Sequence, residues 1–559
     1  MSRTTRKSTP RVRTGCQTCR IRRVKCDEAK PSYLKCTQTG RKCDGYTART
    51  PSSVLISPQS SSDEVAGRRS PPGLAAIKVY SIPFRMPGSQ RDRQLLHYFC
   101  VQGANEFAGF VPNEFWSKTA LYASQNETIV RQSLIALSAL HVDLSGSGCS
   151  SRSGSGSGPG PGPGHPVGDA TLRQYGKALR SLQTRIARSS GDGTCAGRFE
   201  TAKTALICCV LFYCFESALG DVPAALNHLD NGLRLMNKVL AFRDDEDDDE
   251  EMRSIRDTLG RLDMQATFFD DARAPALALV SRRERERGLS VGFGLGSGSG
   301  GAGPATSFAS LADAQKQLIR MSNWLLRFLQ ENTAYQGQPA SCIPASVLAE
   351  KHRLTREFDL WQQRHGIFTA CLAPPPPPPT EPGAADRRSA DRAARTLLAQ
   401  HGVLQMLLSS KVPDRPQVFG AVPNRAAEEL VQLCQDVLRL DDSGDAAATA
   451  GPALMKPWTL SSETGVVVPL FLLAMKCADE GVTARAVELL AASKRREGLY
   501  DAGAVASLVG QLKGAMSQRR QQSEELGLGS SQEDALEHWV ADLLDQAPGG
   551  ASTMAAMLD

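Results

Sequence analysis

Two copies of one cysteine spacing constrain the N-terminal part of the chain more than any other feature. They lie in GCQTCRIRRVKCDEAKPSYLKCTQTGRKC, residues 15–43. The cysteines are Cys16, Cys19, Cys26, Cys36 and Cys43. Two and then six residues separate the first three, and six separate the last two, so the second copy lacks its first member at position 33, where Tyr33 stands. Cysteines at such short spacings indicate a small domain that folds around zinc.

Basic side chains crowd between the cysteines of the first copy. They are Arg20, Arg22, Arg23 and Lys25. Residues 1–50 hold 14 Lys+Arg and 3 Asp+Glu, a net charge of +11, whereas the whole chain is +6, so the other 509 residues carry −5. This asymmetry predicts a basic head that binds a polyanion and a body that binds proteins or small molecules.

The other cysteines and the N-terminus indicate the cellular compartment. The chain has 15 cysteines in 559 residues, and those outside the N-terminal block are scattered, which favours a reducing compartment over a disulfide framework. The N-terminus is basic without an apolar core, as in a nuclear import signal rather than a secretory signal. The longest apolar run, residues 204–215, is too short to span a bilayer and predicts a buried helix, with Cys208, Cys209 and Cys214 as core residues. We therefore expect a nuclear protein without a membrane partner.

Apolar periodicity divides the rest of the chain. Residues 51–90 are rich in Ser and Pro and predict a flexible linker between residues 1–50 and the body. From 91 to 547, apolar residues recur at three- and four-residue steps, which predicts a mainly all-α body, and 548–559 form a tail. Low-complexity segments that cannot bury enough apolar surface predict disordered loops inside the body. These loops are 145–167, 243–251, 287–305 and 372–388.

The motifs CQTCRIRRVKCDEAKP and RKCDGY, within residues 16–46, resemble the fungal six-cysteine binuclear zinc cluster of transcription regulators. Two tetrahedral zincs need eight bonds, and six cysteines supply eight only if two of them bridge both metals. The resemblance implies two zincs held in two zinc-bound turns, each followed by a short helix. It also implies that Arg22 and Arg23 contact the base edges of a CGG-type triplet in the major groove, while Arg20 and Lys25 face phosphates. If these cations only add non-specific attraction, the chain would bind all DNA alike.

Tyr33 departs from that family. The resemblance assigns the bridging positions to Cys16 and to position 33, so five thiolates with Cys16 bridging make six bonds, two short of a complete cluster. A neutral phenol with a pKa near 10 is a poor replacement for a thiolate. Four outcomes stay open: one zinc held by four of the five cysteines, two zincs completed by water, a module that no longer folds, or an error in the sequence.

The body also resembles the helical regulatory region of these fungal factors. The similar stretches are LLHYFCVQGANEFAGF, VRQSLIALSALH, QYGKALRSLQ, ALICCVLFYCFESALGDVPAALNHLDNGLRLM and LFLLAMKCADEGVTARAVELLAASKRREGLYDA. The resemblance implies a regulatory and effector-sensing role.

Near the C-terminus, SSQEDALEHWVADLLDQ begins with a capping-box pattern from Ser531 to Asp534. One face of the predicted helix collects Leu536, Trp539, Val540, Leu543 and Leu544. Acidic residues flank this face. It predicts either an activation segment that docks on a coactivator or a helix that packs on the body.

Together these features predict a zinc-dependent, sequence-specific DNA-binding regulator of RNA polymerase II genes that works with transcription machinery or coregulators. The alternative is a helical interaction protein whose zinc module no longer binds DNA. We find no phosphate-binding loop, nucleophile elbow or metalloprotease motif, so an enzyme has no sequence support. No heptad repeat follows the cluster, which leaves both a monomer and a homodimer through the body open.

Overall fold

A computed structural model describes the body of the chain. The described residues are 87–146, 167–192, 195–242, 249–270, 273–289, 307–372, 384–445 and 459–525. By its contacts the chain divides into Met1–Lys78 and Val79–Asp559, and every described residue belongs to the second unit.

The N-terminal half of the body runs from α3 to α10. Its elements are α3 (Gln90–Tyr98), the π-helix η1 (Phe99–Gly103), α4 (Ala104–Ala108), the π-helix η2 (Phe115–Thr119), α5 (Ala120–Asn126), α6 (Thr128–Gly146), α7 (Asp169–Asp192), α8 (Cys195–Leu219), α9 (Val222–Ala241) and α10 (Glu250–Phe269).

The C-terminal half holds the remaining helices and the strands. These are α11 (Arg282–Arg287), α12 (Leu311–Glu331), the 3-10 turns η5 (Thr333–Tyr335) and η6 (Ala340–Cys342), α13 (Ala345–Leu372), α14 (Ala384–Ser410), α15 (Gln417–Gly420), α16 (Arg425–Asp445), β1 (Thr459–Ser461), α17 (Val467–Lys476), α18 (Glu480–Ala492), β2 (Arg495–Glu497), β3 (Tyr500–Asp501) and α19 (Ala502–Glu525).

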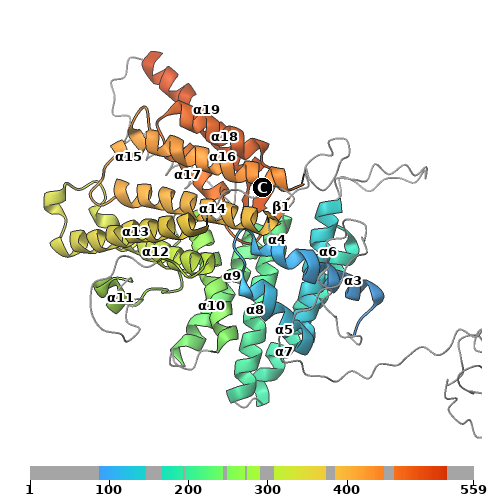
Figure 1. The fold of residues 1–559 in the computed structure, drawn as a ribbon. Helices are drawn as coiled ribbons and strands as arrows, with labels where there is room; N and C mark the ends of the chain where they lie inside the picture. The colour runs from blue at the N-terminus through green and yellow to red at the C-terminus, as the bar shows by residue number, and fades with distance from the viewer. Residues whose placement is uncertain are drawn as a thin grey trace, which may run out of the picture. The chain divides into compact units, whose positions relative to one another are not determined.

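The predicted core helix is α8, which packs against α6, α7 and α9 (Figure 1). Cys208, Cys209 and Cys214 are buried, as predicted. By length and composition Gly197–Leu219 could cross a bilayer, but 83% of its apolar window is buried in the body, as expected of a core helix.

Local signals explain where several helices begin. The Asp221 side chain accepts a hydrogen bond from the Ala224 N–H at the start of α9, and Pro223 occupies the first turn, where no intrahelical N–H bond is lost. Ser310 caps α12 in the same way through the Asp313 N–H. These caps satisfy backbone donors that the helices themselves leave free.

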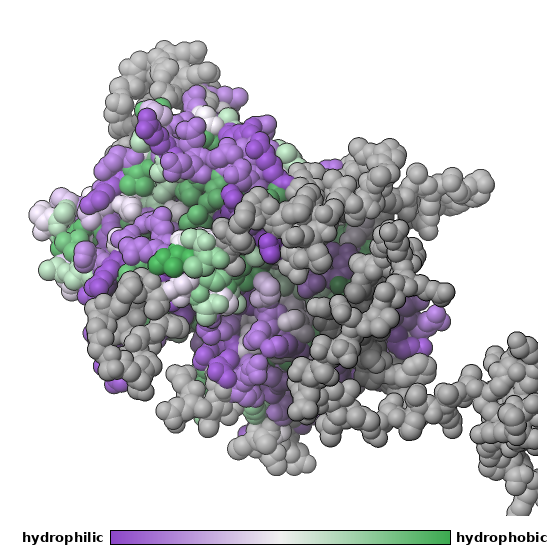
Figure 2. Space-filling view, viewed as in Figure 1, coloured by the Kyte–Doolittle hydropathy of each residue, from purple (hydrophilic) through white to green (hydrophobic). Residues whose placement is uncertain are grey.

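α10 joins the two halves, because it contacts α8, α9 and η2 on one side and α12 on the other. Beyond it, α12, α13, α14, α16, α17, α18 and α19 pack in succession (Figure 1). Buried apolar residues from both halves form one continuous hydrophobic core. On the face shown in Figure 2, hydrophilic residues dominate the described surface, including that of α10, and hydrophobic residues form only small patches.

The structure confirms a mainly helical body and adds a small sheet that the sequence pattern did not predict. β1 pairs with β2 in parallel, with Thr459 opposite Arg495, and β2 pairs with β3 antiparallel. The strands contain only two or three residues each, too few for an alternating pattern to show.

The predicted loops were too wide, because helices extend into them. α6 continues to Gly146, Asp249 caps α10, and α14 begins at Ala384. The end of the acidic run is structured, since Lys203 pairs with both Asp249 and Glu251. The predicted linker ends at Ser89, whose side chain caps α3. The interiors of the four loops lie outside the described residues.

Candidate functional site

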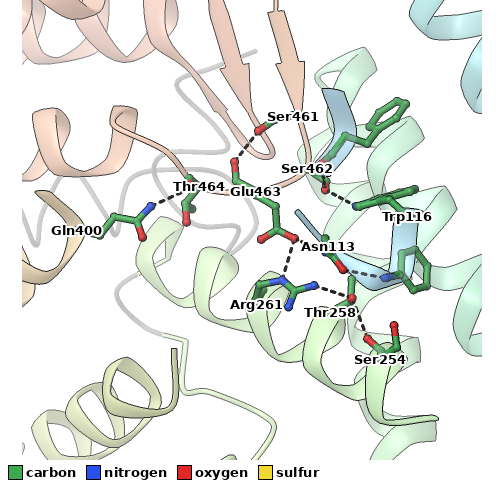
Figure 3. Close-up of polar contacts among 12 residues, drawn as sticks. Asn113, Trp116, Ser254, Thr258, Arg261, Gln400, Ser461, Ser462, Glu463 and Thr464 are labelled. Atoms are coloured by element: carbon green, nitrogen blue, oxygen red, sulfur yellow. Dashed lines mark hydrogen bonds and ion pairs between the residues drawn. The ribbon is translucent and has the colours of Figure 1, made fainter. Parts of the chain in front are cut away.

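Several predicted features lie outside the described residues, and their roles stay predictions. They are the zinc ligands, the DNA-contacting cations, Tyr33 and the helix predicted for residues 530–546. Within the body, polar side chains converge where residues 461–467 cross η2, α10 and α14. We call this region the junction (Figure 3).

Glu463 lies at the centre of the junction. Its Oε1 accepts a hydrogen bond from Asn113 Nδ2 at 3.0 Å and pairs with Arg261 Nε at 2.8 Å (Figure 3). The exposed fractions of the two charged side chains are 6% for Glu463 and 13% for Arg261. Arg261 Nη2 also donates to Thr258 Oγ1 at 2.8 Å on the preceding turn of α10. A buried carboxylate is tolerated here because it is both paired and hydrogen-bonded.

Ser462 connects the junction to the aromatic core. Its hydroxyl accepts a hydrogen bond from Trp116 Nε1 at 3.1 Å and donates one to the Phe107 carbonyl at 2.7 Å (Figure 3). The Ser462 N–H donates to the same carbonyl at 3.1 Å. One small side chain therefore satisfies polar groups on both α4 and η2.

A second buried carboxylate, Glu497 on β2, caps α17. It accepts hydrogen bonds from the N–H groups of Gly465, Val466 and Val467 at 2.7, 3.2 and 3.0 Å. Burial raises the pKa of Glu497 above its usual value, while Arg495 and these N–H groups oppose the shift. The carboxyl thus stands where a helix N-terminus favours an anion.

Two glycines permit this arrangement. A Cβ on Gly465 would lie 2.2 Å from the Phe110 ring and 2.4 Å from Glu497 Oε1. Gly498, in the β2–β3 turn, has φ +56°, and a Cβ there would lie 2.0 Å from Gln265 Oε1. The Gln265 side-chain amide donates to the Glu497 carbonyl at 3.3 Å. The side chain of α10 therefore packs directly against the backbone of the β2–β3 hairpin.

A small cavity adjoins the junction between α10, α12, α14 and α17. Its volume is about 60 Å³, and its lining includes Arg261, Gln400 and Glu463 on the polar side and Phe268 and Leu404 on the apolar side. Small-molecule pockets usually measure about 300–1,000 Å³, and even benzene occupies an engineered cavity of about 150 Å³. The cavity holds a few atoms at most, so a larger effector would require the surrounding helices to separate.

The junction is suited to holding structure together rather than to catalysis. Its two carboxylates bind an arginine or backbone N–H groups. Within the described ranges, no group of three or more His, Cys, Asp or Glu side chains is placed to hold a metal ion. The junction mechanically joins η2 and α10 to α14, α17 and the sheet.

Comparison with known proteins identifies two domains in the chain. The fungal Zn(2)-Cys(6) binuclear cluster domain matches residues 14–53, and the fungal specific transcription factor domain matches residues 94–266. The chain therefore carries both domains of the fungal zinc-cluster transcription regulators. The regulator is not an enzyme, in agreement with the sequence-based prediction.

Curated relatives of this zinc-cluster regulator are also transcription regulators. The aspercryptin biosynthesis cluster-specific transcription regulator atnN of Emericella nidulans is 23% identical over 88% of this chain and 85% of its own length. Transcription regulator lscL of Purpureocillium lilacinum is 31% identical over 40% of this chain and 48% of its own length. Transcriptional regulatory protein moc3 of Schizosaccharomyces pombe is 64% identical over 36 residues, which are 6% of this chain and 7% of its own length. No solved structure matches the chain.

No sequence pattern predicted the junction. Asn113 and Glu463 are 350 positions apart, and neither belongs to a recognisable motif. The only local signal is the glycine at position 465 directly before an apolar helix, which is too common to identify a site.

Proposed function

We propose that this zinc-cluster regulator is a nuclear, sequence-specific DNA-binding protein that controls RNA polymerase II genes by reading CGG-type triplets in the major groove. The observation that carries the proposal is the coincidence of the matched zinc-cluster domain, residues 14–53, with five cysteines at the repeated spacing and with the cations between them. Zinc folds such modules, and arginine binds guanine O6 and N7 with two hydrogen bonds.

The proposed roles of the cations can be separated by substitution in the full-length protein. Arg23→Ala should cost about 1–3 kcal/mol on the preferred site and little on random DNA, because a base contact carries sequence information. Lys25→Ala should weaken binding to all sequences alike and reduce the salt dependence. Equal losses on both DNAs for Arg23→Ala would rule out base readout by this residue.

Tyr33 determines how much zinc the module holds. We propose that the native chain binds fewer than two zincs, because a phenol neither bridges two metals nor ionises near neutral pH. Native mass spectrometry should then count two zincs only in Tyr33→Cys, with Tyr33→Ser as the control that adds no thiolate. DNA affinity should rise together with zinc content, since metal binding drives folding in such modules. Two tightly held zincs in the native chain would contradict this account.

The alternative function is that of a helical interaction protein that regulates through partners without binding DNA. The incomplete ligand set at Tyr33 is the observation that favours it. Selection of bound sequences from a random duplex library with the full-length protein decides between the two functions. Enrichment of a CGG-containing site supports direct DNA binding, and no enrichment supports the alternative.

The body would supply partners and regulation. We propose that it contacts coregulators, and it offers the only described surface for a homodimer. The helix predicted within residues 528–550 would either activate transcription or pack on the body. Fusion of these residues to an unrelated DNA-binding domain should activate a reporter only in the first case.

Target genes form the last part of the proposal. The relative from Emericella nidulans is named for the biosynthesis cluster that it regulates. We propose that this regulator likewise controls a set of biosynthetic genes. Transcript profiling after deletion of its gene should show such a set changing together, and scattered changes would contradict the proposal.

A further inference from the structure

The exposed side of α7 carries a row of cations. Arg173, Lys177, Arg180 and Arg188 are all exposed, and their steps of four, three and eight residues place them on one helical face. Between Asp169 and Asp192, which begin and end the helix, there is no acidic residue. The row spans about 22 Å along the helix axis, at about 1.5 Å per residue.

Part of this row lines an open groove against the start of α6. The groove has a volume of about 470 Å³, and its lining comprises Ile129 of α6 together with Lys177, Arg180, Ser181, Thr184, Arg185 and Arg188 of α7. Ile129 is its one apolar residue. We call this feature the α7 groove.

The cations of the row are not used by the described fold. Arg173, Lys177, Arg180 and Arg188 have no ion pair with a carboxylate in the part of the chain that the structure describes. Arg185 differs, because its guanidinium binds both carboxylate oxygens of Glu127, at 3.0 and 3.3 Å, and thereby ties α7 to the start of α6. One arginine therefore fixes the groove, while the four cations of the row are exposed and have no carboxylate partner among the described residues.

The row is also unfavourable for the helix that carries it. Like charges three or four positions apart destabilise a helix by about 0.2–0.5 kcal/mol per pair. Arg173 and Lys177 are four apart, and Lys177 and Arg180 are three apart. Outside residues 1–50 the chain carries −5, so an acid-free row of this length does not follow from the composition of the body.

We propose that the α7 groove binds the phosphate backbone of duplex DNA and adds sequence-independent affinity to that of the zinc-cluster module. Arginine, lysine and serine side chains are among the groups that contact phosphates, and Arg180, Lys177 and Ser181 supply these three types. The Thr184 hydroxyl instead donates to the Arg180 carbonyl at 2.8 Å. An acidic amphipathic peptide fits less well, because such peptides dock by apolar side chains and this groove offers only Ile129.

Covalent connection to the module makes even weak phosphate binding effective. The matched zinc-cluster domain ends at residue 53 and α3 begins at Gln90, so the intervening chain can span at most about 130 Å. A module bound to DNA therefore keeps the groove near the same duplex, which turns the second contact into an intramolecular one. This step, though not the groove itself, rests on the DNA binding proposed above.

The test compares two variants of the full-length protein by fluorescence anisotropy on random duplex DNA over a range of salt concentrations. Lys177→Ala/Arg180→Ala/Arg188→Ala removes three groove cations. Arg253→Ala/Arg283→Ala/Arg287→Ala removes three exposed cations on α10 and α11 and changes the net charge equally. The groove variant should lose roughly tenfold or more in affinity at 100 mM salt, and its slope of log K against log salt should become less negative by about 2.7. The control variant should stay close to the parent.

Three outcomes would overturn the proposal. Equal losses in the two variants would mean that only net charge matters, and an unchanged salt slope in the groove variant would mean that the groove touches no phosphate. A groove variant that loses binding to a polyglutamate peptide but keeps its affinity for DNA would identify a protein partner instead.

A chelator separates this proposal from the proposed function. Removing zinc from the full-length protein should abolish any preference for one DNA sequence, whereas the difference between parent and groove variant on random DNA should persist. If the zinc-loaded parent has no sequence preference and the difference is still present, the proposed function fails and the groove proposal stands. If sequence preference is present and the difference is absent, the reverse holds.

Discussion

The junction and the α7 groove are both rich in charge, but they use it in opposite ways. In the junction, Glu463 is paired with Arg261 and hydrogen-bonded to Asn113, and the carboxylate of Glu497 is surrounded by N–H groups. In the groove, Lys177, Arg180 and Arg188 face solvent without a carboxylate partner among the described residues.

The difference separates charges that hold the fold from charges that are available to a partner. A buried charge must be paired, because its desolvation costs several kcal/mol. An exposed charge contributes little to the free energy of unfolding, whether it is paired or unpaired. Substitutions in the junction should therefore change the free energy of unfolding, and substitutions in the groove should change binding and leave stability nearly unaltered.

The largest effect is expected from breaking the pair at the centre of the junction. Glu463→Leu leaves the guanidinium of Arg261 without its carboxylate in a site where it is 13% exposed, and should lower the free energy of unfolding by about 3–5 kcal/mol. Urea denaturation followed by helical circular dichroism measures this loss. Adding Arg261→Met should recover at least half of it, and a double variant as unstable as the single one would show that the pair is not what matters.

Protonation of the buried His401 in acid should place an unpaired charge inside the body. His401 is 1% exposed, donates from Nε2 to the Phe358 carbonyl at 2.9 Å, and stacks on Trp361. Burial lowers its pKa from 6.5 to about 4. Between these values the unfolded chain binds a proton that the folded chain does not, so stability is complete above about pH 6.5 and falls by about 3 kcal/mol as the pH drops to 4.

Unfolding measured at several pH values tests this expectation, with His401→Phe as the comparison. The variant should lose that part of the pH dependence. An identical slope in parent and variant would assign the acid sensitivity to other groups, such as the neighbouring His365, whose pKa burial also lowers.

A smaller loss is expected for Ser462→Ala. The substitution removes the hydroxyl that Trp116 Nε1 donates to, and it leaves that buried donor without its partner. The free energy of unfolding should fall by about 1–3 kcal/mol. Ser462→Cys keeps a weak acceptor on a larger side chain and should lose less; a larger loss for Cys than for Ala would point to packing instead of hydrogen bonding.

The smallest effect belongs to the groove. Lys177→Ala/Arg180→Ala/Arg188→Ala should change the free energy of unfolding by less than about 1.5 kcal/mol in total, because surface substitutions usually stay within about 0.5 kcal/mol each. A slight gain is consistent with the removal of like-charge pairs. A loss as large as that of Glu463→Leu would erase the distinction between the two regions.

The sequence predicted the elements that depend on neighbouring residues. The run at 204–215 predicted α8 because its apolar residues are contiguous. The α7 region was predicted only as a helix, from its apolar periodicity, although its cations form a row that is visible in the printed sequence. A search for acid-free helical faces would have found the groove. The zinc-cluster residues, which give the strongest sequence signal, lie outside the described residues.

The junction and the sheet could not be predicted, because they depend on contacts between distant parts of the chain. β1 and β2 pair across 36 positions with three residues each, and Asn113 meets Glu463 across 350. Burial of a glutamate contradicts its usual surface location, so a single sequence gives no reason to place Glu463 or Glu497 inside. Their partners become known only when the helices are placed in space.

The contacts of α4 and η2 with residues 461–463 have a consequence for how the protein is made. Ribosomes add about 5–20 residues per second, so Trp116 emerges roughly 20 to 70 s before the serine that accepts its hydrogen bond, 346 positions later. During that interval Phe107, Phe115 and Trp116, all of them fully buried in the finished body, lack part of their covering. Nascent chains should therefore be clients of chaperones that recognise exposed aromatic residues, and truncations before residue 461 should be degraded rather than accumulate as a smaller regulator.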